Sequence, residues 1–225
     1  MDRNCSLDEI SDGRFYGVND MVKADCNDCQ GCSACCRGMG SSIVLDPLDI
    51  YRLCAVDNQS FEQLLADKIE LNVVKGLILP NLRMAGESEQ CAYLNEEGRC
   101  SIHSFRPGIC RIFPLGRVYE DHSFQYILQV HECQKSNKTK VKVSKWIDTP
   151  DLKKNEEFII TWHYFMKDLQ QLIQSQTEEA QIKQLNMYVL NVFFLKAYDT
   201  TKDFYDQFHV RMEESKKVIS SLSAQ

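Results

Sequence analysis

The residues of this sequence whose types and spacing indicate chemistry are its cysteines, because thiolate sulfur binds zinc and iron strongly. The chain has 11 cysteines, and the densest run is Cys26, Cys29, Cys32, Cys35 and Cys36. A tight turn can direct two thiolates that are separated by two residues toward one ion. Gly31, Gly38 and Gly40 supply the backbone freedom that such a loop needs. The run therefore predicts a metal-binding loop.

The spacing argues against the simplest iron-sulfur protein. A bacterial ferredoxin uses C-x2-C-x2-C-x3-C-P, whereas here the fourth cysteine comes one residue earlier and no proline follows it. The sequence also has no Walker loop, dinucleotide-binding fingerprint or HExxH helix, and no Ser-His-Asp or Cys-His spacing. The cysteines predict metal binding, and no catalytic residue can be named.

The order of residues around the later cysteines carries a family resemblance. The chain reads C-x2-C-x2-C-C, then C-x-Y-L, then C-x-I-H-x2-R-P-x2-C-R. The matching positions are Cys29, Cys32, Cys35, Cys36, Cys91, Leu94, Cys100, Ile102, Arg106, Pro107, Cys110 and Arg111. This pattern resembles the CxxCxxCC cysteine-cluster proteins, the YkgJ-type zinc- or iron-chelating family, over roughly half of the chain, from Cys29 to Cys133.

The resemblance implies eight metal-binding cysteines, which are Cys29, Cys32, Cys35, Cys36, Cys91, Cys100, Cys110 and Cys133. Eight thiolates could form two four-cysteine zinc sites, one 4Fe-4S cluster with a zinc or spare thiols, or a larger cluster. We favour an iron-sulfur cluster, 4Fe-4S first, over Zn2+. The adjacent Cys35 and Cys36 would crowd one small ion, whereas a cluster presents several metal corners.

Three functions are compatible with such a centre. The first is a redox or cluster-assisted enzyme, and the second is a structural zinc module that mediates protein-protein interaction. Metal delivery ranks last, because Cys91, Cys100, Cys110 and Cys133 are dispersed and indicate a site built into the fold.

Two arginines flank the last ligands and are candidate cofactor-binding residues. The guanidinium groups of Arg106 and Arg111 could donate hydrogen bonds to cluster sulfurs or bind an anionic substrate. Ion pairs with Glu96, Glu97 or Asp121 are the alternative.

The remaining candidate cysteines and histidines are interpreted mainly as residues that do not bind metal. Cys26 lies outside the family pattern and is interpreted as a reduced thiol at the loop edge, with an additional ligand as the alternative. Cys54 is interpreted as a small buried hydrophobic residue and Cys5 as an exposed thiol. His103 is expected to support the ligands rather than bind metal, and His131 is expected at the surface, with proton transfer as the alternative.

Composition favours a reducing compartment. The first 25 residues lack the apolar segment of a secretory signal, and an odd number of cysteines fits disulfide pairing poorly. The longest apolar run, 187–197, is shorter than the roughly 20 residues of a membrane span. We therefore expect a soluble, cytoplasmic protein with no membrane partner.

The net charge of −6 disfavours a nucleic-acid partner. The lysine-rich stretch 134–145 is the only basic candidate, and it contains neither arginine nor a stacking aromatic residue. We interpret it as a solvated linker or strand. A small molecule or a protein is the expected class of substrate.

The elements that position these residues predict an α+β fold. We expect a polar leader at 1–25, a cysteine-cluster domain at 26–140 and a helical region at 141–225. In the cysteine domain, 42–45 predicts a strand, Pro47 begins a helix and Ser60 caps a second helix that runs through Ile69. Short apolar runs at 77–84, 91–94, 115–119 and 124–130 predict a small antiparallel sheet.

The C-terminal region predicts about three helices. Phe158, Trp162, Phe165, Leu169 and Leu172 recur at helical spacing, which places them on one face. A second helix carries Ile182, Leu185, Val189, Val192 and Phe193, and a third carries Phe204, Phe208, Met212 and Ile219. Each buries one apolar stripe, so the three are expected to pack together.

Overall fold

A computed structural model describes residues 6–27, 32–176 and 178–223. The chain forms two compact units. Unit 1 comprises Met1–Val44 and Leu82–Lys153, and unit 2 comprises Leu45–Asn81 and Lys154–Gln225. Each unit is therefore built from two separate stretches of chain, whereas the sequence zones were drawn as three consecutive stretches.

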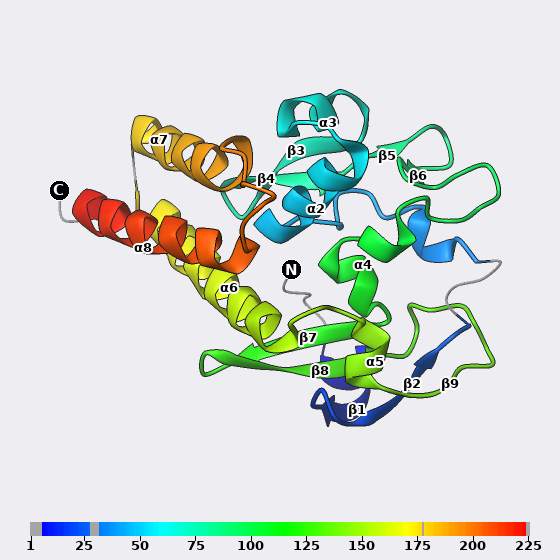
Figure 1. Ribbon diagram of the computed structural model, residues 1–225. Coiled ribbons are helices and arrows are strands. Elements are labelled where there is room, and N and C mark those ends of the chain that lie inside the picture. The colour runs from blue at the N-terminus through cyan, green and yellow to red at the C-terminus, as the bar shows by residue number, and fades with distance from the viewer. Residues whose placement is uncertain (1–5, 28–31, 177, 224–225) are drawn as a thin grey trace. The chain divides into compact units, whose positions relative to one another are not determined.

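Unit 1 is built mainly from short strands. Its elements are α1 (Leu7–Ile10), β1 (Ser11–Tyr16), β2 (Met21–Asp25), the 3-10 turn η1 (Ala34–Cys36), β5 (Met84–Ala85), β6 (Gln90–Cys91), η2 (His103–Phe105), α4 (Gly108–Ile112), β7 (Leu115–Glu120), β8 (Ser123–Gln129), β9 (Thr139–Lys142) and α5 (Val143–Ile147). The hairpin of β7 and β8 is extended by β1 into an antiparallel sheet in the order β1-β8-β7 (Figure 1).

The N-terminal segment that reads as a polar leader contributes strands to this unit. β1 pairs with β8, and β2 pairs antiparallel with β9, with Met21 opposite Lys142 and Asp25 opposite Thr139. β9 comes from the lysine-rich stretch, so the strand interpretation of that stretch is confirmed over Thr139–Lys142.

The core of unit 1 lies beneath these strands. Its buried members are Tyr16, Val22, Ala24, Cys26, Ile112, Leu115, Tyr126, Leu128, Val143, Trp146 and Ile147. The indole N–H of Trp146 donates to the carbonyl oxygen of Ile112 at 3.1 Å, which satisfies the polar atom of a buried aromatic side chain. α5 is thereby fixed to the end of α4.

Unit 2 is mainly helical. It contains α2 (Pro47–Asp57), α3 (Phe61–Asp67), β3 (Ile69–Val74), β4 (Leu77–Leu82), α6 (Leu152–Ser175), α7 (Glu179–Leu190), the π-helical turn η3 (Asn191–Leu195) and α8 (Phe204–Ser223), with α6 and β4 each running a residue or two across its boundary. The N-cap of α3 is Ser60, as predicted, since its side chain accepts from Gln63 N. Helix α2 begins at Pro47, also as predicted.

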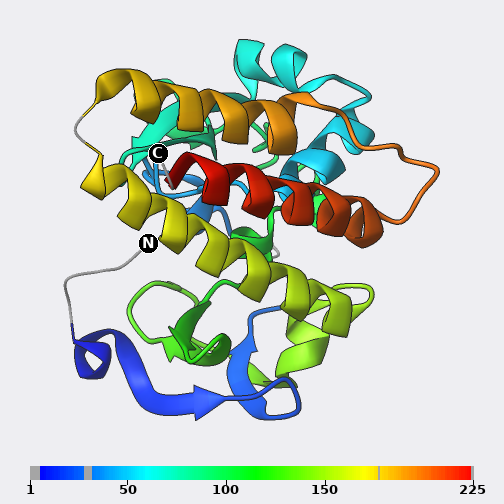
Figure 2. The same ribbon diagram turned by 90° about the vertical axis from the view of Figure 1, so that its left-hand side faces the viewer.

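The three predicted C-terminal helices are confirmed as α6, α7 and α8, which lie side by side with α8 in the middle (Figures 1 and 2). Aromatic rings fill the space between them: the ring of Phe158 lies 4.6 Å from that of Phe208, and Trp162 lies 5.1 Å from Phe193. Tyr188 Oη donates to Ser215 Oγ at 3.2 Å, which joins α7 to α8.

The α+β fold class is confirmed, and three local predictions were wrong. The apolar runs at 77–84, 115–119 and 124–130 do not share one sheet, because β4 pairs with β3, whereas β7 pairs with β8. Ile69 begins β3 rather than extending α3. The segment 42–45 forms no strand among the described elements, although Leu82 N donates to Ile43 O at 3.0 Å and Leu45 N donates to Pro80 O at 2.8 Å. Within the described part of the chain, no helix combines the length and apolar character needed to cross a membrane.

Candidate metal centre

The adjacent cysteines Cys35 and Cys36 lie on η1, and a short hairpin fixes this turn. Arg37 bridges to Gln90 of β6, and Gly38 N donates to Glu89 O at 3.0 Å. The side chain of Arg37 also donates to Gln90 Oε1 at 2.9 Å. These bonds place η1 beside the hairpin that carries Cys91.

Cys91, which ends this hairpin, and Cys100, which lies in the segment after it, both interact electrostatically with Cys36. Leu94 forms an antiparallel bridge with Cys100, and Ser101 N donates to Tyr93 O at 2.8 Å, so the chain folds back on itself between the two cysteines. The pKa of the Cys36 thiol is raised by its hydrogen bond with Cys35, by burial, and by the negative charges of Cys35, Cys91 and Cys100. We call Cys36, Cys91 and Cys100 the hairpin group.

Of the adjacent pair, Cys35 is the thiol that ionises more readily. The pKa of the Cys35 thiol is lowered to about 7, chiefly by its hydrogen bond with Cys36 and in part by the charge of Arg106, against the effect of burial. The pKa of Cys100 is raised, chiefly by burial. A thiolate at Cys35 is the form of this side chain that binds a metal ion.

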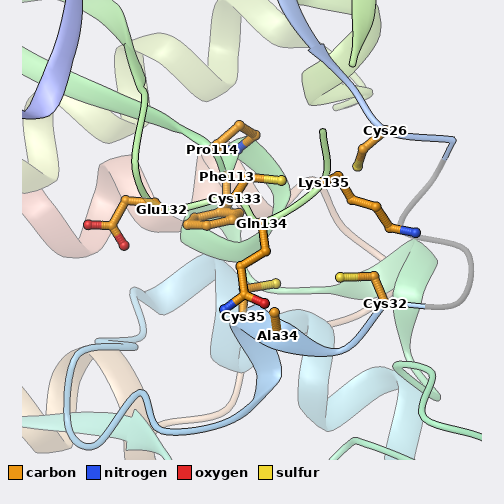
Figure 3. A pocket seen from close by; sticks show the side chains of 10 residues that line it. All are labelled: Cys26, Cys32, Ala34, Cys35, Phe113, Pro114, Glu132, Cys133, Gln134 and Lys135. Carbon is orange, nitrogen blue, oxygen red and sulfur yellow. The ribbon is translucent and has the colours of Figure 1, made fainter. Parts of the chain in front are cut away.

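A second set of cysteines lines one pocket in unit 1: Cys26, Cys32, Cys35 and Cys133. We call these four the pocket group. Figure 3 shows their sulfur atoms directed into the same space, while the carboxylate of Glu132 points away from it. The other lining residues are Ala34, Phe113, Pro114, Gln134 and Lys135.

Strand pairing positions two members of the pocket group. Cys26 follows β2, and Cys133 precedes β9, the strand to which β2 is paired. The side chain of Lys138 donates to the carbonyl oxygen of Cys133 at 3.3 Å, which ties the approach to β9 back to this cysteine. Residues more than 100 positions apart in the sequence therefore line the same pocket.

The described cysteines carry thiols rather than disulfides: Cys26, Cys32, Cys35, Cys36, Cys54, Cys91, Cys100, Cys110 and Cys133. Within 6–27, 32–176 and 178–223, no three His, Cys, Asp or Glu side chains are gathered closely enough to hold a metal ion as they stand. The donor set of the two groups is nevertheless purely sulfur, which four-cysteine zinc sites and iron-sulfur clusters both use.

A comparison with protein-family models decides which family this arrangement belongs to. Residues 28–145 match the model CxxCxxCC, described as a putative zinc- or iron-chelating domain. The chain belongs to this CxxCxxCC family. The resemblance found in the sequence is thereby confirmed, and metal binding is the property that the family assigns. Searches of curated proteins and of solved structures found no match.

The structure describes all the cysteines of the CxxCxxCC pattern except Cys29. Cys29 lies outside the described residues, as does Cys5, which is not part of the pattern. Cys110 lies half-buried on α4, and its role as a ligand stays a prediction. Cys54 lies on α2 in unit 2, where burial and the charges of Glu62 and Asp57 raise the pKa of its thiol to about 11. Cys54 belongs to a helix of unit 2, whereas the described cysteines of the family pattern belong to unit 1, which fits its interpretation as a packing residue.

The two candidate arginines differ in their surroundings. The charge of Arg106 lowers the pKa of both Cys35 and Cys100, and its guanidinium contacts the ring of His103. Arg111 is only 5% exposed, and it donates to the carbonyl oxygens of Asp148, at 2.8 Å, and of Ser104. Arg106 therefore acts on the thiolates, whereas these bonds of Arg111 join α4 to the residue after α5.

Cys26, interpreted from the sequence as a reduced thiol at the loop edge, is a buried free thiol that lines the pocket. The signal that could have found it is the regular spacing, because Cys26 precedes Cys29 by the same three positions that separate Cys29, Cys32 and Cys35. His131 is exposed, as expected.

Proposed function

We propose that the eight family-pattern cysteines bind metal through their thiolates, that an iron-sulfur cluster is held by members of this set, and that the cluster serves a redox role. One observation carries the proposal: cysteines from η1, from the β6 hairpin and from the segment before β9 meet around the adjacent pair Cys35 and Cys36. The two groups share this turn, so one centre can draw on sulfur atoms from both.

The adjacent pair favours a centre with several metal ions. Cys35 and Cys36 are hydrogen-bonded to each other, yet Cys35 also lines the pocket while Cys36 interacts with Cys91 and Cys100. A 4Fe-4S cluster offers separate iron corners to neighbouring sulfur atoms, and a single zinc ion does not. Spare thiolates then remain for a further ion.

A structural zinc module that mediates protein-protein interaction is the second candidate. The observation in its favour is that the cysteines divide into two groups. The pocket group supplies four sulfur atoms that line one pocket, and none of the three cysteines of the hairpin group lines that pocket. Four thiolates around one Zn2+ form a closed structural site with no open position for chemistry.

Arg106 supports the redox form of the proposal. Its positive charge acts on Cys35 and Cys100, and a reduced cluster carries one more negative charge than an oxidised one. A cation at this place therefore stabilises the reduced state and raises the reduction potential. Arg106 is thus a positioning and tuning residue rather than a ligand.

Anaerobic purification tests the proposal. We expect the isolated protein to contain iron and acid-labile sulfide and to show a visible absorption band that bleaches with dithionite. Stoichiometric zinc in a colourless protein would contradict the iron-sulfur proposal and support the structural zinc module. A folded, anaerobically prepared protein with neither metal would contradict both.

A further inference from the structure

The pocket group contains one cysteine that the family pattern does not include. Cys26 lies two residues before the matched segment 28–145 and is 7% exposed. Its sulfur is directed into the pocket that Cys32, Cys35 and Cys133 also line (Figure 3).

We propose that Cys26 is a metal ligand and that Cys26, Cys32, Cys35 and Cys133 form a four-sulfur site for zinc or iron. This inference rests on the proposed function, because it assumes that the chain binds metal through thiolates. It adds a ninth ligand to the eight of the family pattern. It also assigns the first member of the cysteine run to a particular site.

The backbone on either side explains why Cys26 points inward. Val22, Ala24 and Cys26 are buried at alternate positions, so Cys26 continues the inward face of β2 one residue beyond its end. The side chain of Asp25 accepts from Thr139 Oγ1 at 3.3 Å and from Asn27 N at 3.0 Å. A ligand carried by a paired strand is held in place more firmly than a ligand on a loop.

The charges around the pocket suit a thiolate site. Four thiolates around one divalent ion leave a net charge of about −2, because the ion neutralises only two of them. The side chain of Lys135 lines the pocket beside Cys26 and Cys32 and supplies a positive charge there (Figure 3). The carboxylate of Glu132 points away, which avoids adding a further negative charge.

Packing alone is the competing explanation, because Cys26 also belongs to the buried core of unit 1. Two substitutions separate the explanations. Cys26→Val keeps an apolar side chain of similar size but cannot bind metal, whereas Cys26→Ser keeps a small polar group with a weak ligand. The matched control is Cys54→Val, which removes a half-buried thiol from unit 2.

The experiment reconstitutes full-length protein anaerobically with Zn2+ or Co2+ and measures affinity by competition with a chelator. Sulfur coordination is counted by X-ray absorption, and the metal-free proteins are unfolded with urea. We expect Cys26→Val and Cys26→Ser to weaken the pocket site on the order of 100-fold and to lower its sulfur count from four to three. Cys54→Val should match the wild type in both measurements.

Wild-type affinity and sulfur count in Cys26→Val would overturn the inference and leave the proposed function standing. A wild-type protein that binds no metal would overturn both. If the metal-free Cys26→Val protein unfolds at the wild-type urea concentration while its metal affinity falls, packing cannot account for the loss, and the ligand role is supported.

Discussion

Arg211 shows how a buried charge is accommodated in unit 2. The residue is 6% exposed, and its guanidinium donates to the carbonyl oxygens of Val192, Lys196 and Ala197 at 2.8, 2.6 and 2.7 Å. It also lies 3.6 Å from the centre of the Tyr198 ring, a cation-π distance. Val192 lies in the π-helical turn η3 and Lys196 and Ala197 follow it, so Arg211 satisfies carbonyl groups where this helical segment ends.

Replacing Arg211 by Met should therefore be costly. The change leaves three carbonyl groups without their donor and removes the cation-π contact, so we expect a loss of about 2–4 kcal/mol in the free energy of unfolding. Urea denaturation followed by circular dichroism measures it. The control is Lys216→Met, whose ion pair with Glu213 is exposed, so its loss should change the free energy of unfolding much less. Equal effects of the two substitutions would contradict this account.

Arg106 allows a test of the metal centre that does not remove a ligand. In the iron-sulfur form, Arg106→Gln removes a positive charge that acts on Cys35 and Cys100. The reduction potential should fall by an amount on the order of tens of millivolts, measured by dye-mediated redox titration. Arg117→Gln is the control, because the Arg117 guanidinium packs on the ring of Phe124 instead. An unchanged potential in Arg106→Gln would rule out its tuning role.

Residue types and spacing were enough to predict the family and a cysteine-based metal centre, because ligand chemistry is local to the side chain. They were not enough to place Cys26, whose position depends on a strand pair that joins Asp25 to Thr139 across more than 100 residues. The same limit applies to Arg111, since its partners Ser104 and Asp148 become neighbours only after α4 and α5 have packed.

At the scale of elements, the turn between β3 and β4 depends on Gly76. Its φ of +86° lies in the region that favours glycine, and an added Cβ would lie 2.8 Å from Cγ2 of Ile173 on α6. Asn186 of α7 also uses this turn, donating to Gly76 O at 3.1 Å and accepting from Ile78 N at 2.6 Å. The hairpin, α6 and α7 are thus joined at one place in unit 2.

Gly76→Ala should destabilise the protein by about 2–4 kcal/mol, because backbone strain adds to a clash with a branched side chain. Gly13→Ala separates the two contributions: Gly13 also has a positive φ, but a Cβ there meets nothing within 4 Å, so strain alone should cost about 1–2 kcal/mol. Adding Ile173→Ala to Gly76→Ala should cost less than the sum of the two single changes. Strict additivity would show that the clash is absent.

Helix starts were predictable because caps act over three residues, as Ser60 does with Gln63 N. The end of α3 was not predictable, since Ile69 fits both the helical period of Leu64 and Leu65 and the strand that pairs with β4. The sequence did not predict the strands β1 and β2, for a related reason. Short, mostly polar strands become evident only when the partner strands β8 and β9 are known.

At the scale of the whole molecule, metal should stabilise unit 1 more than unit 2, because all the candidate ligands that the structure describes belong to unit 1: Cys26, Cys32, Cys35, Cys36, Cys91, Cys100, Cys110 and Cys133. A ligand present at 100 times its dissociation constant stabilises the folded state by about 2.7 kcal/mol. Chelation should therefore speed amide hydrogen exchange in β2, η1 and β6, measured by mass spectrometry, and leave α6 and α8 at their original rates. Uniform acceleration across both units would contradict this expectation.

The way each unit is assembled from two stretches limits how the gene can be shortened. A polypeptide trimmed to 28–145 would retain β8 and β9 but lose β1 and β2, and it would retain α2 to β4 but lose α6, α7 and α8. Buried surfaces such as those of Leu53 and Leu64 would then face water. We therefore expect that folding requires more of the chain than the matched segment 28–145, and that a polypeptide of these residues alone aggregates.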